Sequence, residues 1–233
     1  MLDPRQDRVI TRPLIVTSLV TFMLMAALSL WAYLRLPADA LVPLRWGLDG
    51  QVESYAGKLT GLFVTVLLFP LIVGALALVP KVEPRKANLA RSAPAFRATA
   101  YAIIVFFAAL HVLIVGTAMG YQINVGRMIP AAVGLLLVVI GNWLPKVRSN
   151  FLFGIRTPWT LTSDHTWRRT HRVVGRAFVA LGLVAVATSV FLPTGAVLPV
   201  IGGGAALVAV GAIAYSYVIW RTAPDRRSRN GVL

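Results

Sequence analysis

The most regular feature of this chain is the alternation of long apolar segments with short polar ones. Six apolar segments cover residues 14–34, 59–79, 98–118, 128–145, 173–193 and 197–220. A helix needs about 20 apolar residues to cross about 30 Å of hydrocarbon, and most of these segments approach that length. Because backbone polar groups in a bilayer must bond within their own segment, we predict an all-α integral membrane protein with six transmembrane helices.

Composition agrees with this interpretation. Of the 233 residues, 58% are hydrophobic and 13% are charged, whereas a soluble domain carries about 25% charged residues. The chain contains no cysteine, which excludes disulfides and thiolate metal sites. We expect neither a metal ion nor a cofactor.

The basic residues lie almost entirely on one side of the predicted membrane. The net charge is +15, and all but four of the 23 Lys and Arg residues fall on the side that holds both chain ends; the four exceptions are Arg35, Arg45, Lys58 and Arg127. The positive-inside rule then predicts that both termini are cytoplasmic. We interpret the charge as an orientation signal and an attraction to anionic lipid headgroups, with no direct binding of nucleic acid.

The first apolar segment has some features of a cleaved signal peptide. Basic residues precede it, and Ala38-Asp39-Ala40 has the small-x-small pattern of a cleavage site. Its apolar stretch of about 21 residues is longer than the 7–15 residues of a signal peptide. We therefore expect it to remain as a membrane anchor.

Polar residues inside the predicted spans are few. His111 lies well inside the third segment, Asn142 lies near the end of the fourth, and the spans contain no Asp or Glu. The lack of carboxylates argues against a transporter coupled to protons or sodium. His111 is either a neutral imidazole bonded to a neighbouring helix or a proton or peptide site. Gly116 and Gly120 form a GxxxG pattern that favours close helix packing.

Residues 35–58 form the longest segment on the outer side. Gly47 and Gly50 flank a predicted turn around Asp49. The segment either lies on the bilayer or forms a small structured element, such as a hairpin, that meets something outside the cell. Its candidate binding residues are Trp46, Tyr55 and Lys58.

The segment 145–172, on the inner side, is too rich in bulky polar residues for a simple linker. Pro145 ends the fourth span, Gly154 permits a turn, and Thr162 or Ser163 can cap a helix that starts near 164 and continues into the fifth span. On that helix one face carries Trp167, His171, Val174 and Phe178, and another carries Arg168, Arg172 and Arg176.

Enzymatic chemistry has little support in this segment. Ser163, Asp164 and His165 are consecutive, so a helix would splay them apart and prevent a serine-type relay. His165 and His171 are six residues apart, which is not a metal-binding spacing on one helix face. Partner binding and interfacial anchoring remain equally supported. The candidate residues are Asn142, Arg148, Asn150, Arg156, Thr157, Pro158, Trp159, Trp167 and His171.

Three ordered motifs in this region resemble the SdpI family of bacterial membrane immunity proteins. They are G-N-x-L-P-K-x-R-x-N at 141–150, G-I-R-T-P-W-T-L at 154–161 and W-x-x-T-H-R at 167–172. The outer loop is similar to a membrane domain of unknown function that often precedes this signature. That resemblance rests on Leu36-Pro37, Val42-Pro43, Trp46, Gly50, Tyr55 and Lys58. Arg45 stands where that pattern commonly has a histidine, so a role for the histidine does not carry over.

The resemblance implies an organisation and a function. It divides the chain into an N-terminal membrane region, 1–127, and an SdpI-like region, 128–233. It implies a protein of the bacterial inner membrane that confers resistance to a secreted antimicrobial peptide toxin and signals by sequestering a cytoplasmic transcriptional repressor. Transport of a small molecule or peptide and a membrane enzyme acting on lipid are the alternatives. The oligomeric state is not predicted.

Overall fold

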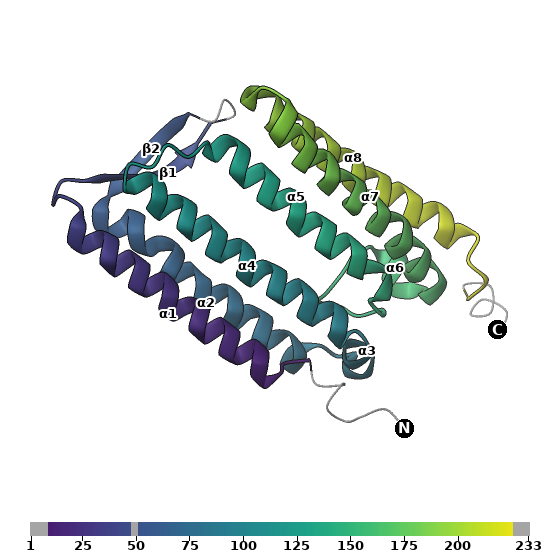
Figure 1. Ribbon diagram of the computed structural model, residues 1–233. Helices are drawn as coiled ribbons and strands as arrows, with labels where there is room; N and C mark the ends of the chain where they lie inside the picture. Colours follow the sequence, from purple (N-terminus) through teal and green to yellow (C-terminus); the bar gives the residue numbers. More distant parts are fainter. Residues whose placement is uncertain (1–8, 48–50, 226–233) are drawn as a thin grey trace.

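Six long helices dominate the computed structural model, which describes residues 9–47 and 51–225 (Figure 1). Each helix is apolar and long enough to cross a membrane. Their bounds are α1 Arg12–Arg35, α2 Lys58–Val82, α4 Ala93–Ala118, α5 Val125–Trp143, α7 Asp164–Phe191 and α8 Thr194–Arg221. They coincide with the six predicted segments, which confirms a multi-pass membrane protein.

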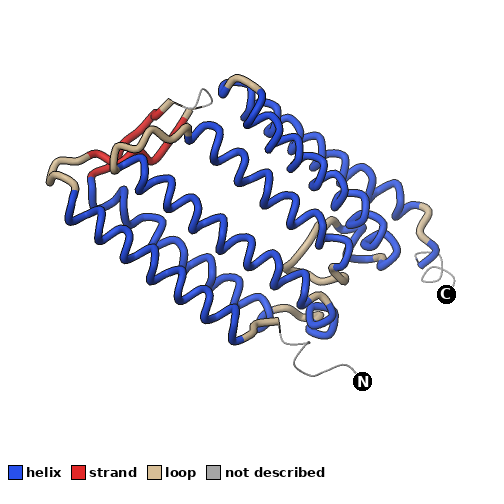
Figure 2. The backbone as a smooth tube through the Cα atoms, in the orientation of Figure 1, coloured by secondary structure: helices blue, strands red, loops and turns tan. Residues whose placement is uncertain are grey.

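The shorter elements lie at the two ends of the helix bundle (Figures 1 and 2). Strands β1 Leu41–Trp46 and β2 Val52–Gly57 form an antiparallel hairpin at one end, which we call the hairpin end. Helices α3 Lys86–Arg91 and α6 Pro158–Thr162 and the 3-10 turn η1 Leu144–Lys146 lie at the opposite end, which we call the α6 end. The start of α1 and the finish of α8 also lie at the α6 end.

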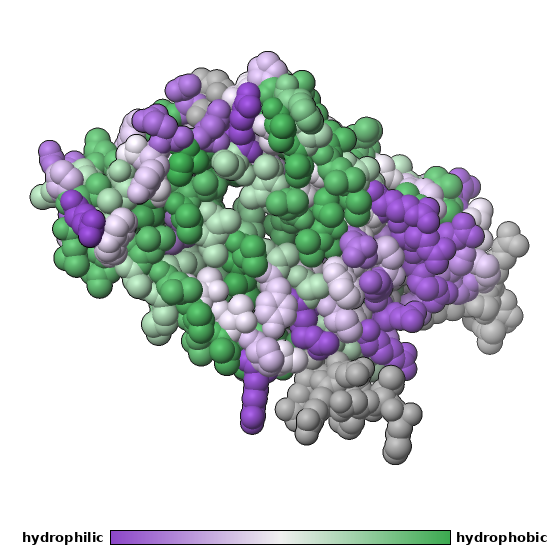
Figure 3. Space-filling view, in the orientation of Figure 1, coloured by the Kyte–Doolittle hydropathy of each residue, from purple (hydrophilic) through white to green (hydrophobic). Residues whose placement is uncertain are grey.

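The outward faces of the long helices are apolar. Large side chains such as Leu34, Leu71, Phe191 and Leu207 are between 68% and 82% exposed. Figure 3 shows hydrophobic residues across the middle of the molecule and hydrophilic residues gathered towards its two ends. This distribution suits a protein whose middle is surrounded by lipid tails, since apolar side chains cost nothing when they face hydrocarbon.

Helices α5 and α7 contact each other more extensively than any other pair of elements. Two glycine pairs make this contact close: Gly134 faces Gly182, and Gly141 faces Gly175. A Cβ atom added to Gly141 would lie 2.5 Å from the carbonyl oxygen of Gly175, and one added to Gly134 would lie 2.6 Å from that of Gly182. Small residues allow backbones to approach in this way inside membranes.

The GxxxG pattern at Gly116 and Gly120 has a different environment from the one that its spacing favours. A Cβ atom at Gly116 would meet Ile123, which lies in the connection after α4. Gly120 follows the helix with a positive φ of 87°, and the space around its Cα is open. Neither glycine therefore packs against another described helix, because α4 ends at Ala118 and the chain turns there.

His111 connects three helices in the middle of the bundle. Its ring is fully buried; Nε2 lies 3.0 Å from the carbonyl oxygen of Met25 on α1, and Nδ1 lies 2.7 Å from Oγ1 of Thr65 on α2. Because a carbonyl oxygen only accepts, Nε2 carries a proton, and Nδ1 shares a hydrogen bond with the threonine hydroxyl. These bonds agree with the part of the first alternative that has His111 bonded to neighbouring helices.

The glycine contact leads to the first prediction. Gly141→Ala should destabilise the protein by about 1–3 kcal/mol, because overpacking a close contact forces the two backbones apart. Gly203→Ala is the matched control, since nothing lies within 4 Å of a Cβ at that position. Thermal unfolding of both variants in detergent should show a lowered midpoint for Gly141→Ala alone. Equal midpoints would contradict the close packing.

Candidate functional site

The hairpin is docked firmly on the helices. Val42 of β1 is fully buried and packs directly against Gly61 of α2, where a larger residue would collide with it. Two register irregularities follow Pro43, as expected for a residue that cannot donate to the ladder. Of the predicted turn, Gly50 and Asp49 lie outside the described residues, whereas the Gly47 N–H donates to the Gln51 carbonyl oxygen at 2.8 Å. The hairpin of the second alternative for this loop is therefore confirmed, whereas its contact with something outside the cell stays a prediction.

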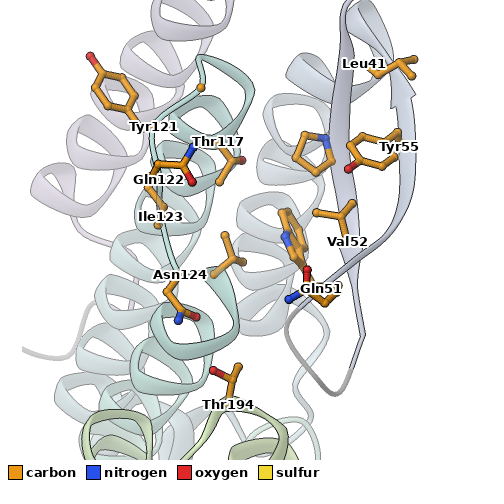
Figure 4. Close-up of a pocket in the computed structure, with 14 residues that line it drawn as sticks. Leu41, Gln51, Val52, Tyr55, Thr117, Tyr121, Gln122, Ile123, Asn124 and Thr194 are labelled. Atoms are coloured by element: carbon orange, nitrogen blue, oxygen red, sulfur yellow. The ribbon is translucent and has the colours of Figure 1, made fainter.

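A cavity of about 540 Å³ lies between the hairpin and the connection from α4 to α5 (Figure 4). Trp46 and Tyr55 line it from the hairpin, as does Gln51. Its described lining residues include no Asp, Glu, Lys, Arg or His. Its remaining uncharged polar side chains come from Thr117, Tyr121, Gln122, Asn124 and Thr194. We call this cavity the outer groove. It offers amide and hydroxyl groups beside aromatic rings, a surface suited to an uncharged polar ligand such as a peptide backbone.

Lys58, the third candidate of this loop, does not line the outer groove. Its Nζ donates to the carbonyl oxygen of Leu36 at 2.6 Å and lies 4.3 Å from the centre of the Tyr33 ring. Leu36 is the C-cap of α1, where a positive charge interacts favourably with the helix dipole. Lys58 therefore caps the C-terminal end of α1.

The other cations at the hairpin end are also held locally. Arg45 pairs with Glu53 at 3.0 Å, and the Arg35 guanidinium lies 4.8 Å from the centre of the Trp31 ring. Arg127 donates to the carbonyl oxygens of Val190 and Leu192 at the end of α7, at 3.5 and 3.4 Å.

At the α6 end, Asn150 shapes the loop that follows α5. It is fully buried, its Oδ1 accepts from the N–H groups of Leu152 and Phe153, and its Nδ2 donates to the carbonyl oxygen of Arg148. An asparagine that bonds its own backbone neighbours in this way fixes a turn. Asn142, by contrast, is exposed near the end of α5.

Trp167 and His171 form the buried centre of the segment. Their rings stack at 4.0 Å, and the Trp167 Nε1 donates to the carbonyl oxygen of Val147 at 2.8 Å. Nε2 of His171 accepts the Ile155 N–H at 3.0 Å, and Nδ1 donates to the carbonyl oxygen of Trp167 at 2.9 Å. The imidazole is therefore neutral, with its proton on Nδ1. Gly154 has a φ of 116°, and a Cβ there would meet the imidazole at 2.5 Å.

The turn before α7 uses hydroxyl groups as caps. Thr157 and Thr160 form a reciprocal capping box around α6, with Pro158 in its first turn, and Oγ1 of Thr157 lies 3.2 Å from Oγ of Ser216 on α8. Ser163, one of the two predicted caps, caps α7 by accepting the Thr166 N–H, and Asp164 occupies the first turn. The predicted faces of α7 are also confirmed, since Trp167, His171 and Val174 are buried and Arg168, Arg172 and Arg176 are exposed.

Two other candidates contact their neighbours from the surface. The exposed Arg156 donates from Nη1 to the carbonyl oxygen of Phe151 at 2.7 Å. Trp159 is half-buried, and its ring lies 5.2 Å from that of Tyr217 on α8. The structure thus brings Asn150, Thr157, Trp167 and His171 together as internal supports and leaves Asn142, Arg148, Arg156 and Pro158 exposed.

Glu83 is a residue that the sequence analysis did not single out. It follows α2 directly and is fully buried. Its carboxylate accepts the Phe151 N–H at 3.0 and 3.1 Å and the Arg85 N–H at 2.9 Å. Its position in the sequence is unusual, because Glu83 is the sole acidic residue between Glu53 and Asp164. A buried carboxylate is costly unless bonded, so this position has a specific structural role.

Asp225, beyond α8, also binds the start of α7. Its carboxylate accepts from the Ser163 hydroxyl at 2.7 and 2.9 Å and from the His165 N–H at 3.1 Å. Burial alone would raise the pKa of Asp225, but these hydrogen bonds and the nearby His165 together hold the pKa below its usual value. The interaction fastens the chain after α8 to the first turn of α7.

The Glu83 bonds lead to the second prediction. Glu83→Ala removes the charged acceptor of the Phe151 and Arg85 N–H groups, at about 1.5–3 kcal/mol for each bond. Glu53→Ala makes the same chemical change in an exposed ion pair, which contributes about 1 kcal/mol or less. Thermal unfolding in detergent should therefore show a much larger loss of stability for Glu83→Ala. Comparable losses would refute the role of the buried carboxylate.

The Asp225 bonds lead to the third prediction. Because its folded-state pKa is depressed, Asp225 contributes stability above the unfolded-state value of about 3.9. That contribution is lost as the pH falls through the lower folded-state pKa. The melting temperature of the protein should exceed that of Asp225→Asn at pH 6, and the difference should shrink below about pH 4. A difference that stays constant across this range would contradict the role of the ionised carboxylate.

Comparison with known proteins connects these sites to a family. Residues 146–216, from η1 through most of α8, match the model of the SdpI/YfhL protein family. The chain is also 24% identical over 177 residues to "Immunity protein SdpI" of Bacillus subtilis (strain 168), which covers 76% of this chain and 81% of that protein. No solved structure matches. The matched region holds Phe151, which is the partner of Glu83, together with the Trp167–His171 stack and the capped turn. Both similarities support membership of the SdpI family.

Proposed function

We propose that this protein is an immunity protein that protects a bacterial cell against a secreted antimicrobial peptide. The observation that carries the proposal is the similarity to "Immunity protein SdpI", which extends over three quarters of the chain. The similarity reaches well beyond the 71 residues matched by the family model, so it includes much of the N-terminal half.

The proposed orientation places the α6 end in the cytoplasm and the hairpin end outside, in the bacterial inner membrane. Among the described residues, the α6 end carries Arg12 at the start of α1, Arg221 at the end of α8, and the basic residues that follow α2 and α5. Short loops rich in Lys and Arg stay in the cytoplasm during insertion. Both termini are cytoplasmic in this orientation, and the outer groove faces the side from which a secreted peptide arrives.

The outer groove supplies the peptide contact in this proposal. Its aromatic residues Trp46 and Tyr55 lie beside uncharged amides, and the nearby cations are already engaged by Trp31, Glu53, Leu36 and the end of α7. The groove therefore favours hydrogen bonding and ring stacking over charge pairing. A peptide backbone with apolar side chains has the matching chemistry.

The α6 end supplies the second contact, with a cytoplasmic repressor. Arg148, Arg156 and Pro158 are exposed there, and Trp159 is half-buried. Arg and Trp are common anchors at protein interfaces. In this proposal Asn150, Thr157, Trp167 and His171 hold the shape of that surface from within.

Transport has no specific support from the described residues. His111 is fully buried and bonded to α1 and α2, and Asn142 is exposed at the end of α5. Neither residue lines one of the described polar cavities.

The fourth prediction concerns immunity. A host strain that lacks the protein should be more sensitive to one of its own secreted peptides, and the intact gene should restore resistance. Trp46→Ala and Tyr55→Ala should reduce resistance about tenfold or more in inhibitory concentration, the scale of losing one well-buried aromatic contact. Trp31→Ala is the control, because Trp31 is 40% exposed on α1 and does not line the groove.

Killing curves over the host's own peptides, with protein levels in the membrane measured in parallel, test the proposal. Identical curves with and without the protein for every peptide would refute the immunity function. Full resistance of the Trp46 and Tyr55 variants would refute the outer groove as the contact while leaving the immunity function in place.

A further inference from the structure

A second polar surface at the α6 end lies apart from the outer groove. Two adjoining cavities of about 490 and 240 Å³ both contain Asn88, Asp164 and Arg168 in their walls. They run between α3, the loop after α5 and the first turns of α7. We call them together the basic groove. The hydrophilic colour in Figure 3 gathers over this end of the molecule.

Arginine side chains dominate the basic groove. Arg85, Arg91, Arg148 and Arg168 line it, against the acidic residues Asp164 and Asp225. Asp225 is already bonded to Ser163 and the His165 N–H. In the part of the chain that the structure describes, the guanidinium groups of Arg91, Arg148 and Arg168 form no hydrogen bond or ion pair. This distinguishes them from the cations at the hairpin end, which are all held locally.

One wall of the basic groove is already held in place by hydrogen bonds before any ligand binds. Arg85 donates to the Ser149 hydroxyl and, at 3.1 Å, to the Leu161 carbonyl oxygen, and its guanidinium lies 4.6 Å from the Phe151 ring. Asn88 donates to the Ser149 carbonyl oxygen at 2.8 Å. These partners are neutral, so Arg85 keeps its full charge while its position is set. A preorganised cation loses little freedom when an anion binds.

The position and charge of this groove together suggest its ligand. It lies beyond the apolar middle of the helices, and a bilayer around that middle would bring its lipid phosphates near this end. Planar guanidinium groups match a phosphate with paired hydrogen bonds. Asp164 lies in the same walls, where it would repel a second phosphate and accept from a hydroxyl group.

We propose that the basic groove, through Arg91, Arg148 and Arg168, binds a single phosphate group that carries neighbouring hydroxyls, as in a phosphoglycerol. That chemistry is present in the headgroup of an anionic phospholipid and in a soluble phosphate ester. The site is separate from the outer groove, and it does not depend on the immunity function.

The fifth prediction tests this site in the full-length protein purified in detergent. The melting temperature is measured with added phosphatidylglycerol, with phosphatidylcholine and with free glycerol phosphate. Arg148→Gln/Arg168→Gln removes two groove cations. Arg172→Gln/Arg176→Gln removes the same charge from exposed positions of α7 that do not line the groove.

We expect a phosphoglycerol ligand to raise the melting temperature of the unmodified protein and of the Arg172/Arg176 variant. The Arg148/Arg168 variant should need about tenfold or more ligand for the same rise, the scale of one lost charge-assisted bond. A rise with phosphatidylglycerol alone identifies the lipid as the source, and a similar rise with free glycerol phosphate identifies a soluble ester. Equal responses of the two double variants, or no response to either ligand, would overturn the site.

Discussion

The close contact of α5 with α7 is the constraint on which the rest of the structure depends. Two glycine pairs bring the backbones together, and a Cβ added at Gly175 would also meet the ring of Pro145 at 2.9 Å. The helices leave no room for the chain between them, so the segment that joins them must fold at the α6 end. Its starting point is therefore fixed by Pro145, and its finish by the Ser163 cap.

Buried polar groups hold this arrangement together because each is bonded to a different part of the chain. His111 joins α1, α2 and α4, whereas His171 joins α7 to the loop at Ile155. Glu83 joins the end of α2 to Phe151, so the N-terminal region contributes directly to the shape of the family signature. Unpaired polar groups are expensive where water is scarce, which makes these bonds specific as well as stabilising.

Local sequence patterns predicted the features that depend on interactions between residues close in the sequence. Apolar length predicted the six spans, a cap at Thr162 or Ser163 predicted the start of α7, and the helical spacing of its residues predicted its two faces. Contacts between distant segments could not be found in this way. The glycine pairs are seven residues apart in each helix and have meaning only once α5 and α7 are known to be partners.

The candidate residues divide in the same manner. Trp46 and Tyr55 line the outer groove, but Lys58 donates a hydrogen bond to Leu36 at the end of α1. The sequence alone could not show this difference. In the sequence, Glu83 is one acidic residue in a basic loop. Its role as an acceptor becomes visible only in the fold, where the Phe151 N–H donates to its carboxylate. The Thr157 cap was equally hidden, since its partner is a threonine in place of the usual Glu or Gln.

Strand β2 passes into α2 with no connecting loop: Gly57 is the last residue of the strand and Lys58 is the first of the helix. The hairpin and Glu83 therefore stand at opposite ends of one uninterrupted backbone. Adding or deleting a single residue within α2 would rotate one end against the other by about 100°. Either Tyr55 would turn away from its groove or Glu83 would turn away from Phe151. The contacts at its two ends therefore constrain the number of residues in α2. Homologues should vary in the sequence of this helix far more readily than in its length.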